Sequence, residues 1–280
     1  MLLIKEALKL DLPLVTSRLK RFIKDYVKKT KAEGAVLNLS GGIDSATATA
    51  LTTLALGKNE VVVLSLPERE TYSPIDIKHT KMLAKKFGFS LVTIDISKVL
   101  QAYYRAIPAF DPKERLCKGN IKARARMICL YYYANRQNRI VVGSSDKSET
   151  MMGYFTKWGD VAADISPLMD LYKTQVRQLA THIGIPAEII AKPSTPQLWP
   201  KQLAEDELGI KYEILDLVLL GLENFVATKE IARQLKLPLT LVEDIKARWL
   251  SSEHKRRAPL TMKMEYRTIG ADFRLPYMPP

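Results

Sequence analysis

The feature that most constrains this chain is a turn with two consecutive glycines, S-G-G-I-D-S, at residues 40–45. It follows a short apolar run at residues 35–39 and precedes small, helix-compatible residues at 46–51. A strand that turns into a helix directs backbone amides outward at the positive end of the helix dipole, and glycines let a ligand approach the backbone closely. The segment therefore predicts a phosphate-binding junction formed by Ser40, Gly41, Gly42, Ile43, Asp44 and Ser45.

Asp44 indicates what kind of phosphate site this is. A carboxylate repels phosphate unless a divalent cation lies between them, so Asp44 is a candidate metal ligand, and the hydroxyls of Ser40 and Ser45 add hydrogen-bond donors. The turn lacks the G-K-[ST] of a Walker loop and the G-x-G-x-x-G of a dinucleotide fingerprint. Its pattern resembles the pyrophosphate loop of ATP pyrophosphatases, which cleave ATP to AMP and pyrophosphate. The alternative is an ordinary β–α turn with a serine cap.

Composition narrows the class of protein. The 280 residues are enough for one large α/β domain, and a net charge of +13 favours anionic partners, either nucleic acid or polyphosphate small molecules. No apolar run approaches the roughly 20 residues of a membrane span, and Glu6 comes too early for a signal peptide. Cys117 and Cys129 form neither a metal motif nor a disulfide framework. We therefore expect a cytoplasmic protein without a membrane partner.

Strand and helix patterns alternate through the first half of the chain. Apolar runs predict strands at residues ~35–39, ~60–66, ~90–95 and ~139–143. Helical spacing predicts helices at residues ~12–32 (closed by Gly34), ~43–56, ~74–87 and ~120–136. This rhythm predicts an α/β fold, a Rossmann-like parallel sheet with helices on both faces. Ligands bind beyond the carboxyl ends of such strands, so the turns at 40–45 and 143–146 can share one site.

The second half of the chain is read as loops and helices. Residues 153–167 form a long loop, and Asp170 caps a helix over residues 171–183. Residues 192–201 carry three prolines and Trp199 and are either a mobile lid or an ordered surface loop. Further helices are expected at residues ~210–221, ~226–235 and ~239–251. The prediction is one domain over residues 1–280, with a helical appendage from about residue 205 to 280.

Charged side chains beyond the glycine turn are candidate ligands. Asn120 and Arg124 are four residues apart and share a helix face; an arginine aimed into a pocket would clamp a carboxylate or phosphate. Glu149 follows the turn of the fourth strand and is a second candidate metal ligand opposite Asp44, or else a first-turn glutamate that suits the helix dipole. Lys173 lies in the first turn of its helix, where a cation opposes the dipole, which hints at a negatively charged ligand.

Two other groups of residues are candidate ligands for which an ordinary structural role is the alternative. Lys122 and Arg126 share a face that a solvated cationic surface explains equally well. The segment at residues 153–160 places aromatic side chains and Lys157 between glycines. Aromatics can sandwich a planar ring and a lysine can hold an anion, whereas the alternative is a surface loop whose aromatics pack on the core.

Six segments together resemble one family. They are S-G-G-I-D-S, G-N-I-K-A-R-A-R-M, V-V-G-S-S-D-K-S-E, G-Y-F-T-K-W-G-D, D-L-Y-K-T-Q-V and S-E-H-K-R-R, within residues ~35–257. Their order and separations look like NAD synthetase. The resemblance implies a fold of the adenine nucleotide alpha hydrolase type. It also implies ATP-dependent amidation of deamido-NAD (nicotinate adenine dinucleotide) by ammonia, giving NAD, AMP and pyrophosphate through an acyl-adenylate.

The resemblance also implies roles for individual residues. ATP binding falls to the turn residues Ser40, Gly41, Gly42, Ile43, Asp44 and Ser45, and to Ser144, Lys173 and Thr195. Deamido-NAD binding falls to Arg124, Lys157, Asp164, His254 and Lys255, with Asn120, Tyr154 and Phe155 as neighbours. The Mg²⁺ ligands are Asp44 and Glu149, and the catalytic residues are Asp44 and Lys173.

Three residues depart from the family's pattern. Asp146 stands where many archaeal-type relatives carry asparagine, and its charge either weakens ATP binding or lies in solvent. Ala204 replaces an aspartate common in the family's mobile loop, and Pro196 replaces a small residue beside Thr195. Closure of the lid is therefore the least supported part of the resemblance.

The resemblance sets expectations for partners. The family is homodimeric, with the dinucleotide site at the subunit interface. Glutamine-dependent members carry a fused amidase of comparable size, for which this chain is too short, so we expect direct use of ammonia. A separate glutaminase partner stays open, and nucleic acid is not expected.

Two alternatives remain at this point. One is another ATP pyrophosphatase, such as a tRNA-modifying adenylating enzyme, because the basic charge would suit tRNA. Thiolation enzymes usually need a cysteine set that this chain lacks, and lysidine-type enzymes an added tRNA-binding domain. The other alternative is a nucleotide-binding scaffold that lost turnover. Its converging charges would be costly to hold without a ligand.

Overall fold

The computed structural model describes residues 1–71, 73–264 and 266. Within these residues a sheet of four parallel strands has the order β3-β2-β1-β4. The strands are β1 (Ala35–Asn38), β2 (Val61–Ser65), β3 (Ser90–Thr93) and β4 (Ile140–Val141). All four lie where the apolar runs predict strands, which confirms the parallel α/β fold.

Helices cover both faces of the sheet, as predicted. On one face Leu37 and Val63 pack with α1 (Leu12–Lys29), α2 (Ile43–Leu56) and α7 (Lys173–His182). On the other face Val36 and Leu64 pack with α4 (Ser97–Ala106) and α5 (Arg115–Arg136). Alternate residues of β1 and β2 therefore enter opposite cores, which explains why these strands read as continuous apolar runs rather than as an alternating pattern.

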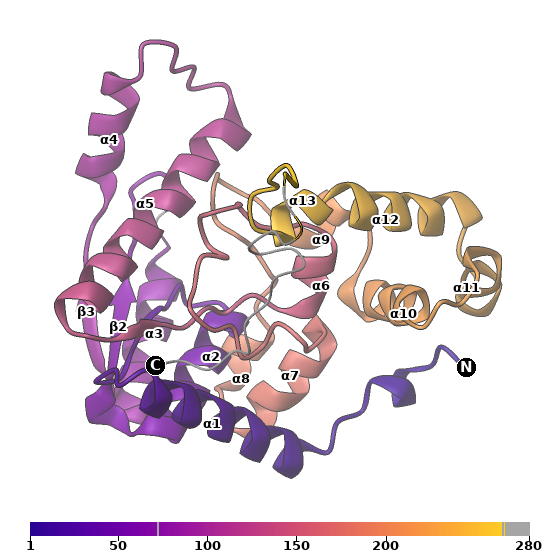
Figure 1. Ribbon diagram of the computed structural model, residues 1–280, viewed down its shortest axis with the longest axis horizontal. Helices are drawn as coiled ribbons and strands as arrows, with labels where there is room; N and C mark the ends of the chain where they lie inside the picture. The colour runs from indigo at the N-terminus through magenta and orange to yellow at the C-terminus, as the bar shows by residue number, and fades with distance from the viewer. Residues whose placement is uncertain (72, 265, 267–280) are drawn as a thin grey trace.

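A third apolar core lies beside the sheet domain and is built mainly from the C-terminal helices (Figure 1). These are α9 (Ala204–Leu208), α10 (Tyr212–Glu223), α11 (Thr228–Leu235), α12 (Leu239–Ser251) and α13 (Glu253–Arg256). The N-terminal η1 (Lys5–Leu8) and α6 (Lys147–Met151) pack into the same core. The division into one domain with an appendage stays a prediction, and residues 265 and 267–280 of that appendage lie outside the described residues.

The remaining described elements are short or connect the strands. They are η2 (Lys58–Glu60), α3 (Pro74–Phe87) and α8 (Ala187–Ile190). Helices α2 and α3 have the predicted bounds. Among the described residues, none of the helices combines the length and the apolar character that a membrane crossing requires.

The structure corrects four details of the sequence analysis. Helix α1 ends at Lys29 with Thr30 as its C-cap, so Gly34 does not close it. Asp170 does not cap α7, because that helix begins at Lys173 after Tyr172, and the Asp170 side chain is 97% exposed. Helix α4 was not predicted, and α5 begins at Arg115, five residues earlier than expected. Apart from α4, which was missed entirely, the errors fall at helix ends, where local signals are weakest.

Candidate nucleotide-binding site

The glycine turn joins β1 to α2, as the sequence predicts, and its geometry requires glycine. Gly41 has φ of 84°, and a Cβ at this position would lie 2.9 Å from the backbone and the side chain of Asp76 on α3. Both the left-handed conformation and the close approach exclude a larger residue. The turn is thereby pressed against the N-terminal end of α3 at the carboxyl edge of the sheet.

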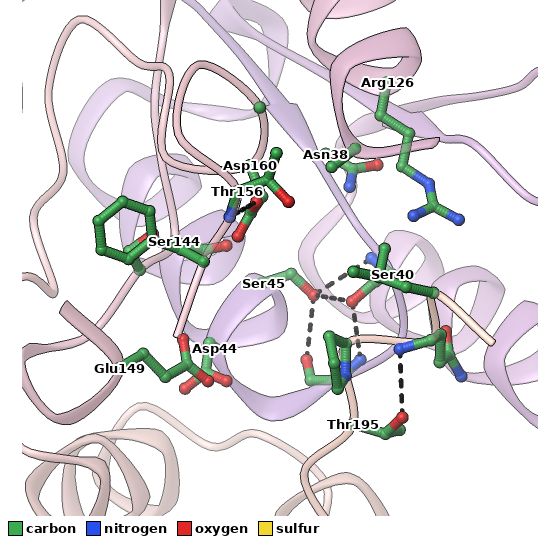
Figure 2. Close-up of a pocket in the computed structure, with 18 of the residues that line it drawn as sticks. Asn38, Ser40, Asp44, Ser45, Arg126, Ser144, Glu149, Thr156, Asp160 and Thr195 are labelled. Carbon is green, nitrogen blue, oxygen red and sulfur yellow. Dashed lines mark hydrogen bonds between the residues drawn. The ribbon is translucent and has the colours of Figure 1, made fainter. Parts of the chain in front are cut away.

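The two serines of the turn bond to each other and to its backbone (Figure 2). Ser45 Oγ donates to the Gly42 carbonyl at 3.1 Å and accepts from the Ser40 amide at 3.2 Å. Ser40 Oγ lies 3.0 Å from Ser45 Oγ and accepts from the Gly42 amide at 3.3 Å. These hydroxyls and amides lie within one small loop, where they can redirect toward an anionic ligand.

A cluster of three carboxylates and one lysine lies beside the turn. The Lys173 Nζ atom is 2.6 Å from Asp44 Oδ2, 2.9 Å from Glu149 Oε1 and 2.8 Å from Asp146 Oδ2. Figure 2 shows the Asp44 and Glu149 carboxylates facing each other. One oxygen from each of the three carboxylates lies within 4.8 Å of the others. The structure thus brings together the residues expected to bind metal and phosphate.

Asp146 lies inside this cluster rather than in solvent. Its side chain is fully buried, and Oδ1 accepts the Glu149 amide at 2.8 Å, which makes Asp146 the N-cap of α6. The expectation that its charge lies in solvent is therefore wrong. An asparagine in this position can also form that cap through its side-chain oxygen, but it would not add a negative charge beside Lys173.

The charges of the cluster do not balance. Three carboxylates and one ammonium sum to −2 (−3 + 1) when all are ionised. Burial raises the pKa of Asp146 to about 6 and the pKa of Glu149 well above its ordinary value. Burial alone would lower the pKa of Lys173, but the three carboxylates raise it well above the ordinary value. The cluster therefore favours additional positive charge.

The donor set suits a hard divalent cation. Asp44 Oδ1 is buried and has no hydrogen-bond partner among the described residues. Together with Glu149 it offers carboxylate oxygens of the kind that Mg²⁺ prefers, and substrate phosphates and water complete such sites in proteins. The cluster therefore fits Mg²⁺ bound by Asp44 and Glu149.

A cavity of about 570 Å³ opens next to the cluster and contains most of the predicted site residues. Those that line it are Ser40, Gly42, Ile43, Asp44, Ser45, Arg124, Ser144, Glu149, Lys157, Thr195, His254 and Lys255. Gly41 faces Asp76, and Lys173 is fully buried behind Asp44 and Glu149. Asp164 lies at the end of β4, where Oδ2 accepts the Val141 amide at 2.7 Å.

The residues expected to bind deamido-NAD are linked by hydrogen bonds from side chains to backbone carbonyls. Arg124 Nη2 donates to the Lys157 carbonyl at 3.2 Å, and Lys157 Nζ donates to the His254 carbonyl at 2.6 Å. Lys255 Nζ donates to the carbonyls of Gly153 and Phe155. The C-terminal segment and the loop at residues 153–160 are thereby joined at one side of the cavity.

The candidate lid segment, residues 192–201, contributes residues 192–199 to the lining of the cavity. Lys192 and Gln197 contact Asp76, beside the glycine turn, and the loop amide of Gln197 donates to Thr195 Oγ1 at 3.2 Å. Next to Gln197, the Leu198 carbonyl accepts from Lys122 Nζ at 2.8 Å. The lid segment is therefore bonded at Lys192, Gln197 and Leu198, and the solvated alternative for Lys122 is wrong because its side chain is 0% exposed.

Three further residues of the site were missed or undervalued in the sequence. Arg126 extends from α5 toward the glycine turn, with Nε 3.3 Å from the Leu66 carbonyl (Figure 2), and burial lowers its pKa. Lys122 pairs with Glu68 at 2.7 Å. Asp216 is buried beside Lys173. The sequence could have indicated Asp216, because it is a charged residue within the apolar run of residues 214–220. No local pattern in the sequence indicates the role of Glu68.

The fold and the site define an α/β nucleotide-binding protein with a phosphate turn of the ATP pyrophosphatase type. A family model described as NAD synthase matches residues 15–259. The chain belongs to the NAD synthase family, which confirms the resemblance found in the sequence.

Similar proteins agree with this assignment. The chain is 42% identical over 257 residues to an NH(3)-dependent NAD(+) synthetase of Hyperthermus butylicus, covering 91% of this chain and 92% of that protein. An NMN synthetase from Francisella tularensis has a similar structure, with a TM-score of 0.80 and 32% identity over 91% of this chain and all of that one. An NH3-dependent NAD synthetase from Campylobacter jejuni has a TM-score of 0.76 and 28% identity over 91% of this chain and 100% of that one.

Proposed function

We propose that this protein catalyses ATP-dependent amidation of deamido-NAD by ammonia, giving NAD, AMP and pyrophosphate. The observation that carries the proposal is the meeting of the glycine turn with the Asp44, Glu149 and Lys173 cluster beside one cavity. Membership of the NAD synthase family and the NH3-dependent relatives support the same reaction. They do not favour a tRNA-modifying enzyme.

The reaction needs an activated carboxylate, because oxide is a poor leaving group. The nicotinate carboxylate oxygen attacks the α-phosphorus of ATP, the bond to the β-phosphate oxygen breaks, and pyrophosphate leaves. Ammonia then attacks the carbonyl carbon of the acyl-adenylate, AMP leaves, and the nitrogen loses a proton to form the amide. No protein nucleophile is needed, so the chain contributes positioning and charge neutralisation.

The ATP phosphates fit the glycine turn. Its amides and the hydroxyls of Ser40 and Ser45 would donate to phosphate oxygens. Ser144 and Thr195 line the same cavity and would contact ATP. Lys173 is assigned to the ATP phosphates by its place in the family motif, and its ammonium lies 2.6 Å from Asp44, which lines the cavity.

Mg²⁺ is proposed as the cofactor, held by Asp44 and Glu149. The net negative charge of the cluster and the buried Asp44 oxygen without a partner support this choice. The ion would supply Lewis-acid polarisation of the phosphate oxygens. Asp146 leaves more negative charge beside Lys173 than an asparagine would, and so favours cation binding.

The deamido-NAD site is proposed at the opposite side of the cavity. Arg124 and Lys157 present cations there, and His254 and Lys255 approach from the C-terminal helices. Asp164 is assigned to this site by its place in the family motif, although its carboxylate is bonded to the Val141 amide.

A homodimer is the proposed assembly. Helix α5 exposes Leu116, Ile128 and Tyr132, and the adjacent α4 exposes Val99 and Tyr103. Apolar groups clustered on neighbouring helices mark an interaction surface. Arg124 is four residues before Ile128 and shares its side of the helix, which would place the dinucleotide site at the interface. Ile128→Glu should therefore convert a dimer to a monomer in sedimentation velocity; a wild-type monomer would contradict the proposal.

Ammonia is the proposed nitrogen donor, and a cytoplasmic location is proposed from the two unpaired cysteines. A separate glutaminase stays open as a partner. Glutamine supplied to the purified protein in place of ammonium should give no NAD, and robust glutamine-driven amidation would contradict this part of the proposal.

Nicotinate mononucleotide is the second candidate substrate, because one similar structure is an NMN synthetase. The deciding assay incubates the protein with ATP, Mg²⁺, ammonium and either deamido-NAD or nicotinate mononucleotide, and measures AMP together with the amidated product. We expect higher kcat/KM for deamido-NAD. A preference for the mononucleotide would change the assigned substrate. If the protein forms no AMP with either substrate, the proposed function is refuted.

A further inference from the structure

Asp216 is a fully buried carboxylate in an otherwise apolar stretch of α10. Its neighbours Leu215, Val218 and Leu219 are packed in the core of the C-terminal helices. A charged group in such a place is costly unless hydrogen bonds compensate for the water it loses. The partners of Asp216 therefore indicate what the group is for.

Those partners are the beginnings of two helices that carry site residues. Ser148 Oγ, on α6, donates to Asp216 Oδ1 at 2.6 Å. The amide and hydroxyl of Thr174, on α7, donate to Oδ2 at 2.8 and 2.7 Å. Ser148 Oγ in turn accepts the Lys173 amide at 2.9 Å. The first two amides of α7 are thus satisfied by Asp216, directly or through Ser148, as an N-cap would satisfy them.

Tyr212 contacts the same lysine from one turn earlier on α10. Its ring centroid is 5.1 Å from Lys173 Nζ, and its side chain is fully buried. The phenol oxygen has no hydrogen-bond partner in the part of the chain that the structure describes, so the ring face makes the contact. Helix α10 therefore supports both the backbone and the ammonium of Lys173.

This arrangement matters because a lysine side chain has a long, flexible stem. The Lys173 ammonium can meet Asp44 and Glu149 within 2.9 Å only if the start of α7 and the start of α6 hold a fixed separation. Ser148 immediately precedes Glu149, so the three hydrogen bonds of Asp216, one from Ser148 and two from Thr174, set that separation.

We infer that Asp216 is a positioning residue for the reaction, linking α10 to α6 and α7 so that Lys173 and Glu149 meet Asp44 beside the cavity. The inference rests on the proposed roles of Lys173 and Glu149. It assigns the C-terminal helices a part in adenylation that the family's ligand-binding motifs do not include.

The test compares Asp216→Asn with Val218→Ala. Asparagine has the same shape, but its amide group would face a donor at Ser148 or Thr174, which leaves that donor unpaired. Val218 is also fully buried on α10, and its truncation destabilises the same helix without touching Lys173. We expect both variants to fold with lower thermal stability. Only Asp216→Asn should lower kcat for NAD formation, by about 10-fold or more, with KM for deamido-NAD unchanged.

A second readout does not depend on activity. Hydrogen exchange at the Lys173 and Thr174 amides should be faster in Asp216→Asn and unchanged in Val218→Ala. Equal kcat and equal exchange in the two variants would overturn the inference, whereas a wild-type protein that makes no NAD would overturn the proposed function instead.

If Asp216→Asn does not fold, Ser148→Ala replaces it. This variant removes the hydroxyl that joins Lys173 to Asp216 but leaves both bonds from Thr174. A decrease in kcat at constant KM, with faster exchange at the Lys173 amide alone, would support the inference. Wild-type values for both would overturn it.

Discussion

The buried Lys122 gives the sharpest test of what holds the lid in place. Its side chain is 0% exposed, and its ammonium lies 2.7 Å from Glu68, 2.7 Å from Glu70 and 2.8 Å from the Leu198 carbonyl. The three donors of the ammonium therefore join helix α5, the loop after β2 and the lid. Lys122→Met keeps the length of the side chain but removes all three interactions.

The loss of folding stability in Lys122→Met depends on how well Glu68 and Glu70 are solvated or bonded without the lysine. Removing one partner of a buried ion pair costs about 3–5 kcal/mol. Glu68 keeps the Thr71 hydroxyl at 2.7 Å and two backbone amides, and Glu70 is 37% exposed and can be hydrated. We therefore expect the lower end, about 3 kcal/mol. At about 2–4 °C per kcal/mol, the melting temperature should fall by about 6–12 °C.

The contribution of Glu68 to the pH dependence of stability has opposite signs in the wild type and in Lys122→Met. Burial alone would raise the pKa of Glu68, but bonds from Lys122, Thr71 and Glu70 hold it below its ordinary value of 4.5. In the wild type this stability is present above pH 4.5 and is lost as pH falls through the lower folded pKa. Without Lys122, burial should raise the pKa above the unfolded value, and acidification then relieves the penalty.

Thermal unfolding followed by circular dichroism measures both effects. The difference in melting temperature between wild type and Lys122→Met should shrink as pH falls from about 7 toward 4. The matched control is Lys118→Met, because Lys118 pairs with the partly exposed Glu70 at 2.8 Å and lies over the Tyr104 ring, and its removal should matter by about 0–1 kcal/mol. Adding Glu68→Gln to Lys122→Met should recover part of the loss. A Lys122→Met protein as stable as the control, or a double variant with no recovery, would refute the reasoning.

Three further predictions concern activity. Asp44→Asn should lower Mg²⁺-dependent pyrophosphate release by about 100-fold or more without unfolding the protein, and unchanged turnover would remove Asp44 from the metal site. Lys157→Ala should raise KM for deamido-NAD about 10-fold, since a charged hydrogen bond is lost, and an equal change in KM for ATP would contradict its assigned role. In Gly119→Ala the new Cβ would lie 3.0 Å from the Leu198 side chain. Displacement of the lid should lower kcat/KM for ATP relative to Asn135→Ala, an exposed change on the same helix, and equal values would argue against a lid role.

The sequence predicted the sheet and the glycine turn because both depend on local pattern. Consecutive apolar residues specify buried parallel strands, and a double glycine between strand and helix specifies a phosphate turn. Helix ends were predicted less well. Aspartate is a common N-cap residue, which favoured Asp170, but the residue before α7 is Tyr172. The Tyr172 hydroxyl donates to Glu223 Oε2 on α10 at 2.6 Å, a tertiary contact that the local sequence does not reveal.

The cluster around Lys173 shows where prediction from sequence stops. Asp44 and Glu149 were candidates because each follows a strand and a turn, and parallel topology brings such ends to one edge of the sheet. Asp146 was placed either against ATP or in solvent, because one position in a sequence does not reveal burial. The structure places it fully buried beside Lys173.

The chain by itself determined the positions of the four strands, the glycine turn and the family, since each of these is written in short stretches of adjacent residues. Only the tertiary structure decided that Lys122 is buried against the lid segment and that Asp216 bonds to Thr174 and Ser148, which are 42 and 68 residues away, beside Lys173. The physical reason is that burial and charge pairing depend on which distant segments exclude water together. A charged residue takes its role from those neighbours rather than from its own position in the sequence.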